Sequence, residues 1–289
     1  MGIIGKEGIV MISFKESSVY VENNLKLRTY PLAIQFFETP EEMLKDVPKI
    51  RIWPDLLSFC QYVGIARTAG WTIGVTAKNL SMPDCMFTLG LAPLPEEGYM
   101  DGETFEGVWC RTRPEAVKYT QSRPRIPFGK HTAIAISPIA SGRLSNPQIT
   151  LFYGTPAQMN LLLNAAQWES YERFKFYFCG EGSCGDSLAE CYINRKIFLT
   201  IPCFGERRFG CVQDDELEVA IPPERLLEIE NGLKGLKKAG TAAYPITTFG
   251  QMSSPLPAIS MVYPQLSDYI KAVGRGEFLK RIPRDKKSN

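Results

Sequence analysis

The sequence predicts an α/β protein in which helices pack on a mixed sheet. Three observations support this fold class. Short runs rich in β-branched and aromatic residues alternate with helical segments, prolines and glycines mark the ends of both, and no flexible linker divides the chain. With 289 residues, of which 44% are apolar, the chain is long enough to bury a substantial core.

The strands are predicted from composition and punctuation. Each run is rich in residues that favour β-structure, and proline or glycine bounds several of them. Strands are expected at residues 31–38, 71–77, 131–139, 148–153, 173–178, 196–201 and 216–221.

Three helices are predicted from their boundary residues. The first covers residues 55–68 and follows a proline, which suits the first turn of a helix. The second, over 155–168, has Thr155 as N-cap and Pro156 at its first position. The third, over 222–240, is amphipathic, begins on proline and ends on glycine.

The domain organisation follows from the same pattern. We expect an N-terminal extension over residues 1–30, a cysteine-bearing α/β domain over 31–240, and a C-terminal extension with a basic tail over 241–289. An internal boundary is placed within 91–130, because this stretch is polar and rich in proline and glycine. Such a stretch is equally typical of a long functional loop.

Composition argues against several classes of function. The net charge of +2 creates no field that favours nucleic acid or an anionic membrane. No apolar stretch approaches the roughly 20 residues of a spanning helix, and the N-terminus does not resemble a secretory signal. We therefore expect a cytoplasmic protein that binds neither nucleic acid nor membrane.

Eight cysteines accompany a single histidine, His131. Catalytic triads, Cys-His dyads and sites with two or three histidine ligands need imidazole that this chain supplies only once. In a reducing compartment, cysteines are metal ligands, reactive groups or buried core residues before they are disulfides.

Two segments of the chain share an order of features. Residues 60–85 and 184–203 each read cysteine, helix, strand, proline, cysteine, with 24 and 18 residues between their cysteines. This order predicts two pseudo-repeated helix–strand lobes, and a pseudo-twofold packing of the lobes would bring four thiols together. Four convergent thiolates are what an iron–sulfur cluster or a structural zinc ion requires. The alternative is that the cysteines fill the core as small apolar residues, as expected for Cys110 and Cys191.

The loop before Cys184 carries a second pattern. Gly180, Gly182 and Gly185 spell G-x-G-x-x-G, and Glu206 follows at about the distance of a ribose-binding acid, so Gly182 is a candidate cofactor-binding residue. The preceding run is more aromatic and basic than a buried parallel strand, which favours a simple strand-to-helix turn instead.

Cys184 also precedes a predicted helix, whose dipole would lower the pKa of its thiol. A thiolate there would be a nucleophile or a metal ligand. Arg207 and Arg208 lie in a glycine-bounded turn, where a guanidinium would clamp a carboxylate or phosphate. Neighbouring acidic residues offer an alternative partner for both arginines.

These pieces together resemble an uncharacterised family of archaea and anaerobic bacteria, the domain of unknown function 169. The resemblance covers residues 31 to about 236. It is carried by PLAIQFFE, by Cys60 with Ala66 and Gly70, by Cys85 with Gly90, by Gly182-Ser183-Cys184, and by PCFGERRFG with DDELEVAIP. The resemblance implies Cys60, Cys85, Cys184 and Cys203 as a ligand set, and implies no activity, substrate or cofactor. Cys179, Cys191 and Cys211 stand as additions in this chain and leave other ligand sets open.

The leading hypothesis is a cytoplasmic metalloprotein with a thiolate-ligated centre, an iron–sulfur cluster in preference to zinc. Its role would be redox, cofactor maturation or small-molecule chemistry, with a small molecule or a redox protein as partner. One alternative is a metal-free enzyme with Cys184 as nucleophile and Arg207 or Arg208 holding an anionic small molecule. The other is a non-catalytic binding protein whose cysteines lie in the core.

Overall fold

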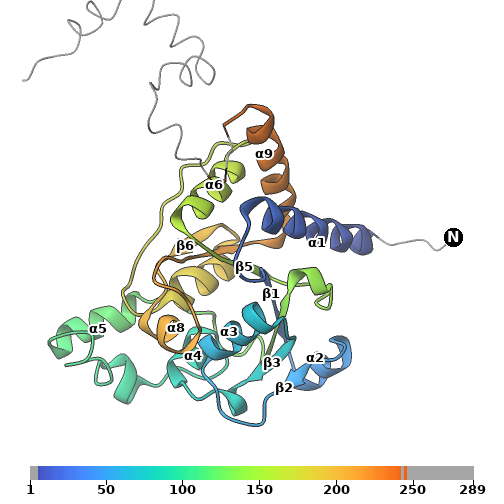
Figure 1. Ribbon diagram of the computed structural model, residues 1–289. Coiled ribbons are helices and arrows are strands. Elements are labelled where there is room, and N and C mark those ends of the chain that lie inside the picture. The colour runs from blue at the N-terminus through green and yellow to red at the C-terminus, as the bar shows by residue number, and fades with distance from the viewer. Residues whose placement is uncertain (1–5, 242–243, 246–289) are drawn as a thin grey trace, which may run out of the picture. The chain divides into compact units, whose positions relative to one another are not determined.

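The computed structural model describes residues 6–241, 244 and 245 (Figure 1). The chain divides into two compact units, Met1–Leu233 and Lys234–Asn289. All of the sheet belongs to the first unit, and the second contributes, within the described residues, the end of the last helix. The basic tail expected at the C-terminus lies outside the described residues.

Within the described residues, seven strands form one mixed sheet in the order β2-β3-β4-β1-β5-β7-β6. Only the β2–β3 pair is parallel among these strands. The strands are β1 (Leu32–Phe37), β2 (Arg51–Ile52), β3 (Ile73–Thr76), β4 (Ala133–Pro138), β5 (Ile149–Gly154), β6 (Phe198–Thr200) and β7 (Leu217–Ile221). The predicted α/β class with a mixed sheet is confirmed.

The centre of the sheet is β1, which pairs antiparallel with β4 on one side and β5 on the other. Ile34 lies opposite Ile136 and Ile149 in these two ladders. All three strands are almost wholly buried, so their apolar residues run on without the alternation of a half-exposed strand. Outward from this centre, β3 pairs with β4 and β6 pairs with β7. The pseudo-repeat of two lobes stays a prediction.

Helices and short helical turns connect these strands. The α-helices among the described residues are α1 (Lys6–Leu25), α2 (Pro40–Asp46), α3 (Phe59–Ala69), α4 (Pro83–Thr88), α5 (Arg113–Ser122), α6 (Pro156–Ala166), α7 (Glu190–Asn194), α8 (Phe204–Phe209) and α9 (Leu226–Lys238). Single 3₁₀ turns are η1 (Ala77–Asn79), η3 (Ile139–Ser141) and η5 (Pro223–Arg225), and π-helical turns are η2 (Glu96–Met100) and η4 (Gly185–Ala189).

Helix starts follow the capping chemistry of the sequence. Thr155 caps α6 and Pro156 occupies its first turn, as predicted. The predicted helix at 55–68 begins later, at Phe59, because Ser58 and Gln61 form a capping box there.

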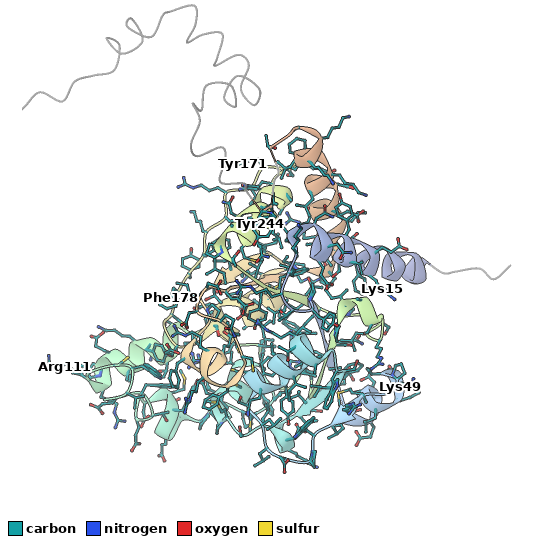
Figure 2. All side chains as sticks on the ribbon, viewed as in Figure 1. Lys15, Lys49, Arg111, Tyr171, Phe178 and Tyr244 are labelled. Atoms are coloured by element: carbon teal, nitrogen blue, oxygen red, sulfur yellow. The ribbon has the colours of Figure 1, made fainter. Side chains whose placement is uncertain are left out.

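The strand predicted at residues 173–178 is wrong. Residues 171–179 are irregular, and side chains along them, including Tyr171 and Phe178, lie at the surface (Figure 2). The run alternates aromatic and basic residues, so one side of a strand here would carry Arg173 and Lys175, which do not fit a sheet whose central strands are buried on both faces. The sequence analysis also missed α1, whose Val21 and Leu25 are fully buried.

Among the residues whose placement is described, no helix combines the length and the apolar character needed to cross a bilayer.

Candidate functional site

Four of the eight cysteines line one cavity of about 640 Å³ in the first unit. They come from segments far apart in the sequence, and they are Cys60, Cys85, Cys184 and Cys203. Figure 1 shows the helices α3, α4 and α8, which carry or adjoin three of them, next to one another. All eight cysteines are free thiols.

Each of the four cysteines sits at the start of a helix. Cys60 lies in the first turn of α3, and Cys85 lies in the first turn of α4 behind Pro83. Cys184 immediately precedes the π-helical turn η4, and Cys203 is the N-cap of α8. Backbone N–H groups of a first helical turn have no partner within their helix, and they favour negative charge nearby. The shared location therefore suits sulfur atoms that carry negative charge.

The four thiols contact one another, with Cys60 in the middle. Its hydrogen bonds with Cys184, Cys203 and Cys85 raise its pKa well above the usual value. Hydrogen bonds from Cys184 and Cys60 hold the pKa of Cys85 well below the usual value. The pKa of Cys203 is lowered by its hydrogen bond with Cys60. Cys85 and Cys203 are thus the thiols that ionise most readily.

Cys184 departs from the effect expected of a helix dipole. Its hydrogen bond with Cys60 lowers its pKa, but its bond with Cys85 and its burial raise it, and the net shift is upward. The dipole was the only influence visible in the sequence, whereas neighbouring thiols and burial outweigh it in the fold.

In the part of the chain that the structure describes, no group of three or more His, Cys, Asp or Glu side chains is arranged to hold a metal ion.

Two buried carboxyl groups lie behind Cys203. Glu206 accepts hydrogen bonds from the Tyr153 hydroxyl at 2.6 Å, from the Ser183 hydroxyl, and from the backbone N–H of Cys203 at 3.3 Å. The other carboxyl is Glu218, which accepts a hydrogen bond from Ser187. Both acids belong to the buried interior, at 3% and 1% exposure.

The surroundings of Glu218 favour its protonated form. Burial raises its pKa well above the usual value, and the charge of Glu206 and a hydrogen bond with it act in the same direction. Its second oxygen, Oε2, has no partner unless one of the two carboxyls is protonated. A protonated Glu218 that donates to Glu206 satisfies both observations.

A buried arginine, Arg67, lies next to these carboxyl groups. Arg67 forms an ion pair with Glu216 at 2.5 Å, and its guanidinium lies 4.1 Å from the centre of the Tyr153 ring. Burial, followed by the charges of Glu206 and Glu218, raises the pKa of Tyr153 well above the usual value, so its hydroxyl remains a donor to Glu206.

Part of the cavity wall is aromatic, and it includes one ion pair. It is built by Phe87, Tyr99, Phe105, Trp109 and Phe204. The guanidinium of Arg123 donates two hydrogen bonds of 2.8 Å to the Asp84 carboxylate, next to Cys85 in the chain.

The remaining predicted site residues divide into two groups. Gly182 lines the cavity with the four cysteines, and a Cβ there would lie 2.9 Å from both Arg123 Nε and Cys179 Sγ. Arg207 and Arg208 are exposed on α8 and are not among the residues that line the cavity. The structure therefore brings Gly182 to the thiols but leaves both arginines at the surface.

Comparisons with known proteins place the chain in a family. The profile of the domain of unknown function 169, described as uncharacterised ArCR, matches residues 21–232. The chain belongs to this family. It is also 27% identical over 99 residues to an uncharacterised protein of Methanocaldococcus jannaschii, MJ0308, in a match that spans 34% of this chain and 42% of that protein. No solved structure matches.

The matched region of the domain of unknown function 169 includes all of the cavity, which is lined by residues between Cys60 and Gly205. Several residues around the thiols were missed from the sequence, above all Glu218, Tyr153 and the Asp84–Arg123 pair. One signal was present: Glu216 and Glu218 alternate along the short strand run that becomes β7, and both are buried. Two acids on one side of an otherwise apolar strand indicate a buried polar site.

Proposed function

We propose that this protein is a cytoplasmic metalloprotein whose Cys60, Cys85, Cys184 and Cys203 ligate an iron–sulfur centre. The observation that carries the proposal is the meeting of four free thiols, from four separate helix starts, on the wall of one cavity. Thiolate is the ligand that iron–sulfur clusters use, and the helix starts favour the negative charge of such a centre.

The surroundings of the thiols support a cluster over a structural zinc ion. Structural zinc sites are closed tetrahedral shells, whereas these sulfurs border a cavity of about 640 Å³. Gly205 adds no side chain over the sulfurs of Cys60 and Cys203, which leaves room beside them. Ligation would require the proton that Cys60 retains to leave, so assembly of the centre would release protons.

The role that fits best is redox chemistry on a small molecule held in the cavity. A bound cluster would supply one-electron transfer. The chain itself would hold the molecule against the aromatic wall, limit water around the sulfurs, and keep a proton on Glu218 close behind Cys203. A redox protein is the expected source of electrons.

Single replacements by serine test the ligand set. We expect Cys60→Ser, Cys85→Ser, Cys184→Ser and Cys203→Ser each to lose or destabilise the centre, measured as iron, acid-labile sulfide and visible absorption after purification without oxygen. The matched control is Cys191→Ser, because Cys191 is equally buried but does not line the cavity. Unchanged iron and sulfide in all four variants would rule out the proposed centre.

A further inference from the structure

We propose that the cavity is a binding site for an uncharged, planar aromatic small molecule with one polar substituent. The inference names the ligand class of the cavity in which the proposed centre would lie, and it concerns binding alone. Its evidence is the aromatic part of the cavity wall.

The shape and composition of this wall favour a flat apolar ligand. A volume of about 640 Å³ lies within the range of small-molecule sites, which are mostly apolar with a few polar groups. Phe87 and Tyr99 have ring centres 4.9 Å apart, and those of Tyr99 and Phe105 are 5.4 Å apart. Such rings offer edges and faces for a further aromatic group.

Part of the wall is exposed without an evident structural reason. Trp109 and Phe204 are each 48% exposed, their ring centres are 6.1 Å apart, and both line the cavity. Val108, beside Trp109, is 63% exposed and lines the cavity as well. Large apolar side chains gathered at the wall of a cavity are typical of a ligand site.

Charge excludes an anionic ligand. Arg123 is the only cation among the described residues that line the cavity, and both of its terminal nitrogens are bonded to Asp84. Glu97 and Glu181 also line the cavity and add negative charge. Away from the helix starts, an anion would therefore meet like charge and lose its water without gaining a cationic side chain as partner.

One polar group of the wall lacks a partner. Thr88 lines the cavity and is fully buried, and its hydroxyl has no hydrogen-bond partner among the described residues. Buried hydroxyls are normally bonded, so a polar substituent on the ligand fits this position.

Two probes with the same ring system test the charge preference. We expect 2-naphthol, which is uncharged at neutral pH, to bind the purified full-length protein saturably at one site, measured by isothermal titration calorimetry. Naphthalene-2-sulfonate should bind at least about tenfold more weakly, because its charge would be buried near carboxylates. Equal or tighter binding of the sulfonate, or no saturable binding of 2-naphthol, would overturn the proposal.

Two variants locate the site. Trp109→Ala and Phe204→Ala should each weaken 2-naphthol binding by about tenfold, since each removes an aromatic contact. The control is Trp168→Ala, because Trp168 is similarly exposed but does not line the cavity. Equal affinity in Trp109→Ala, Phe204→Ala and Trp168→Ala would contradict the proposal. Calorimetry on metal-free protein reads binding even if no iron–sulfur centre exists, so the two proposals fail separately.

Discussion

Helices α3 and α8 start alike but lie in different surroundings. Around α3, Ser58 caps the helix and Gln61 bonds back to it, and around α8 Cys203 and Glu206 occupy the same two positions. Gln61 is half-buried and bonds only locally, whereas Glu206 is buried and also bonds Tyr153 and Ser183.

The charged groups near Cys85 also differ from those near Cys203. Next to Cys85, the carboxylate of Asp84 is matched by Arg123. Behind Cys203, Glu218 forms a hydrogen bond with Glu206, and burial and the charge of Glu206 raise the pKa of Glu218. Cys85 thus lies beside an ion pair with no net charge, whereas Cys203 lies in front of two hydrogen-bonded carboxyl groups. The same capping pattern therefore occurs in two different electrostatic environments.

The largest expected effect is a difference in the free energy of unfolding between variants at Glu206 and at Gln61. Glu206→Ala should lower the free energy of unfolding by about 3 to 5 kcal/mol, because buried hydroxyl and N–H donors lose their acceptor. Gln61→Ala should lower it by about 1 kcal/mol, the usual value of a cap. Urea unfolding at neutral pH measures both, and equal losses would show that the acid pair is no more important to stability than an ordinary cap.

A second expected effect concerns the contact between α3 and the end of α8. A Cβ at Gly64 of α3 would lie 2.7 Å from the carbonyl oxygen of Gly210, which cannot yield without moving α8. We expect Gly64→Ala to cost about 1 to 3 kcal/mol. The control is Gly205→Ala, whose Cβ would meet the sulfurs of Cys60 and Cys203 at ordinary contact distances of 3.5 and 3.7 Å. Thermal unfolding should show a drop for the first variant alone, and an undisturbed Gly64→Ala would contradict a tight α3–α8 contact.

The last expected effect is a change in pH dependence. Because the pKa of Glu218 is raised in the folded protein, its contribution to stability is full below the unfolded pKa of about 4.5 and is lost as pH rises through the folded pKa. This loss amounts to at most about 1.4 kcal/mol per pH unit for one proton.

Glu218→Gln removes that titration while keeping an amide of the same shape. Its stability relative to the unmodified protein should therefore grow as pH rises from 5.5 to 8.5, measured by urea unfolding. Glu103→Gln, at an exposed carboxylate, serves as the control. Parallel stability curves for Glu218→Gln and the unmodified protein would show that Glu218 is not protonated in the fold.

Local sequence patterns predicted most of the secondary-structure elements. Contacts between residues far apart in the sequence determine the surroundings of the thiols. Continuous apolar runs predicted β1, β4 and β5, and Thr155 with Pro156 predicted the start of α6. Residues 173–178 had strand composition, but their basic side chains keep them out of the buried sheet.

The order of cysteine, helix, strand and proline identified the four thiols that meet. Their surroundings were not readable, because Asp84 and Arg123 are 39 residues apart and Tyr153 and Glu206 are 53 residues apart. The raised pKa of Cys184 was not readable from the sequence either, because it depends on neighbouring thiols and on burial that only the fold creates.

The most direct measurement is the iron, acid-labile sulfide and zinc content of the unmodified protein, with its visible spectrum, after purification without oxygen or chelator. The account predicts brown protein with near-stoichiometric iron and sulfide. Colourless protein that holds zinc would keep the thiol ligands and contradict the iron–sulfur centre. Colourless protein without metal would contradict the account as a whole.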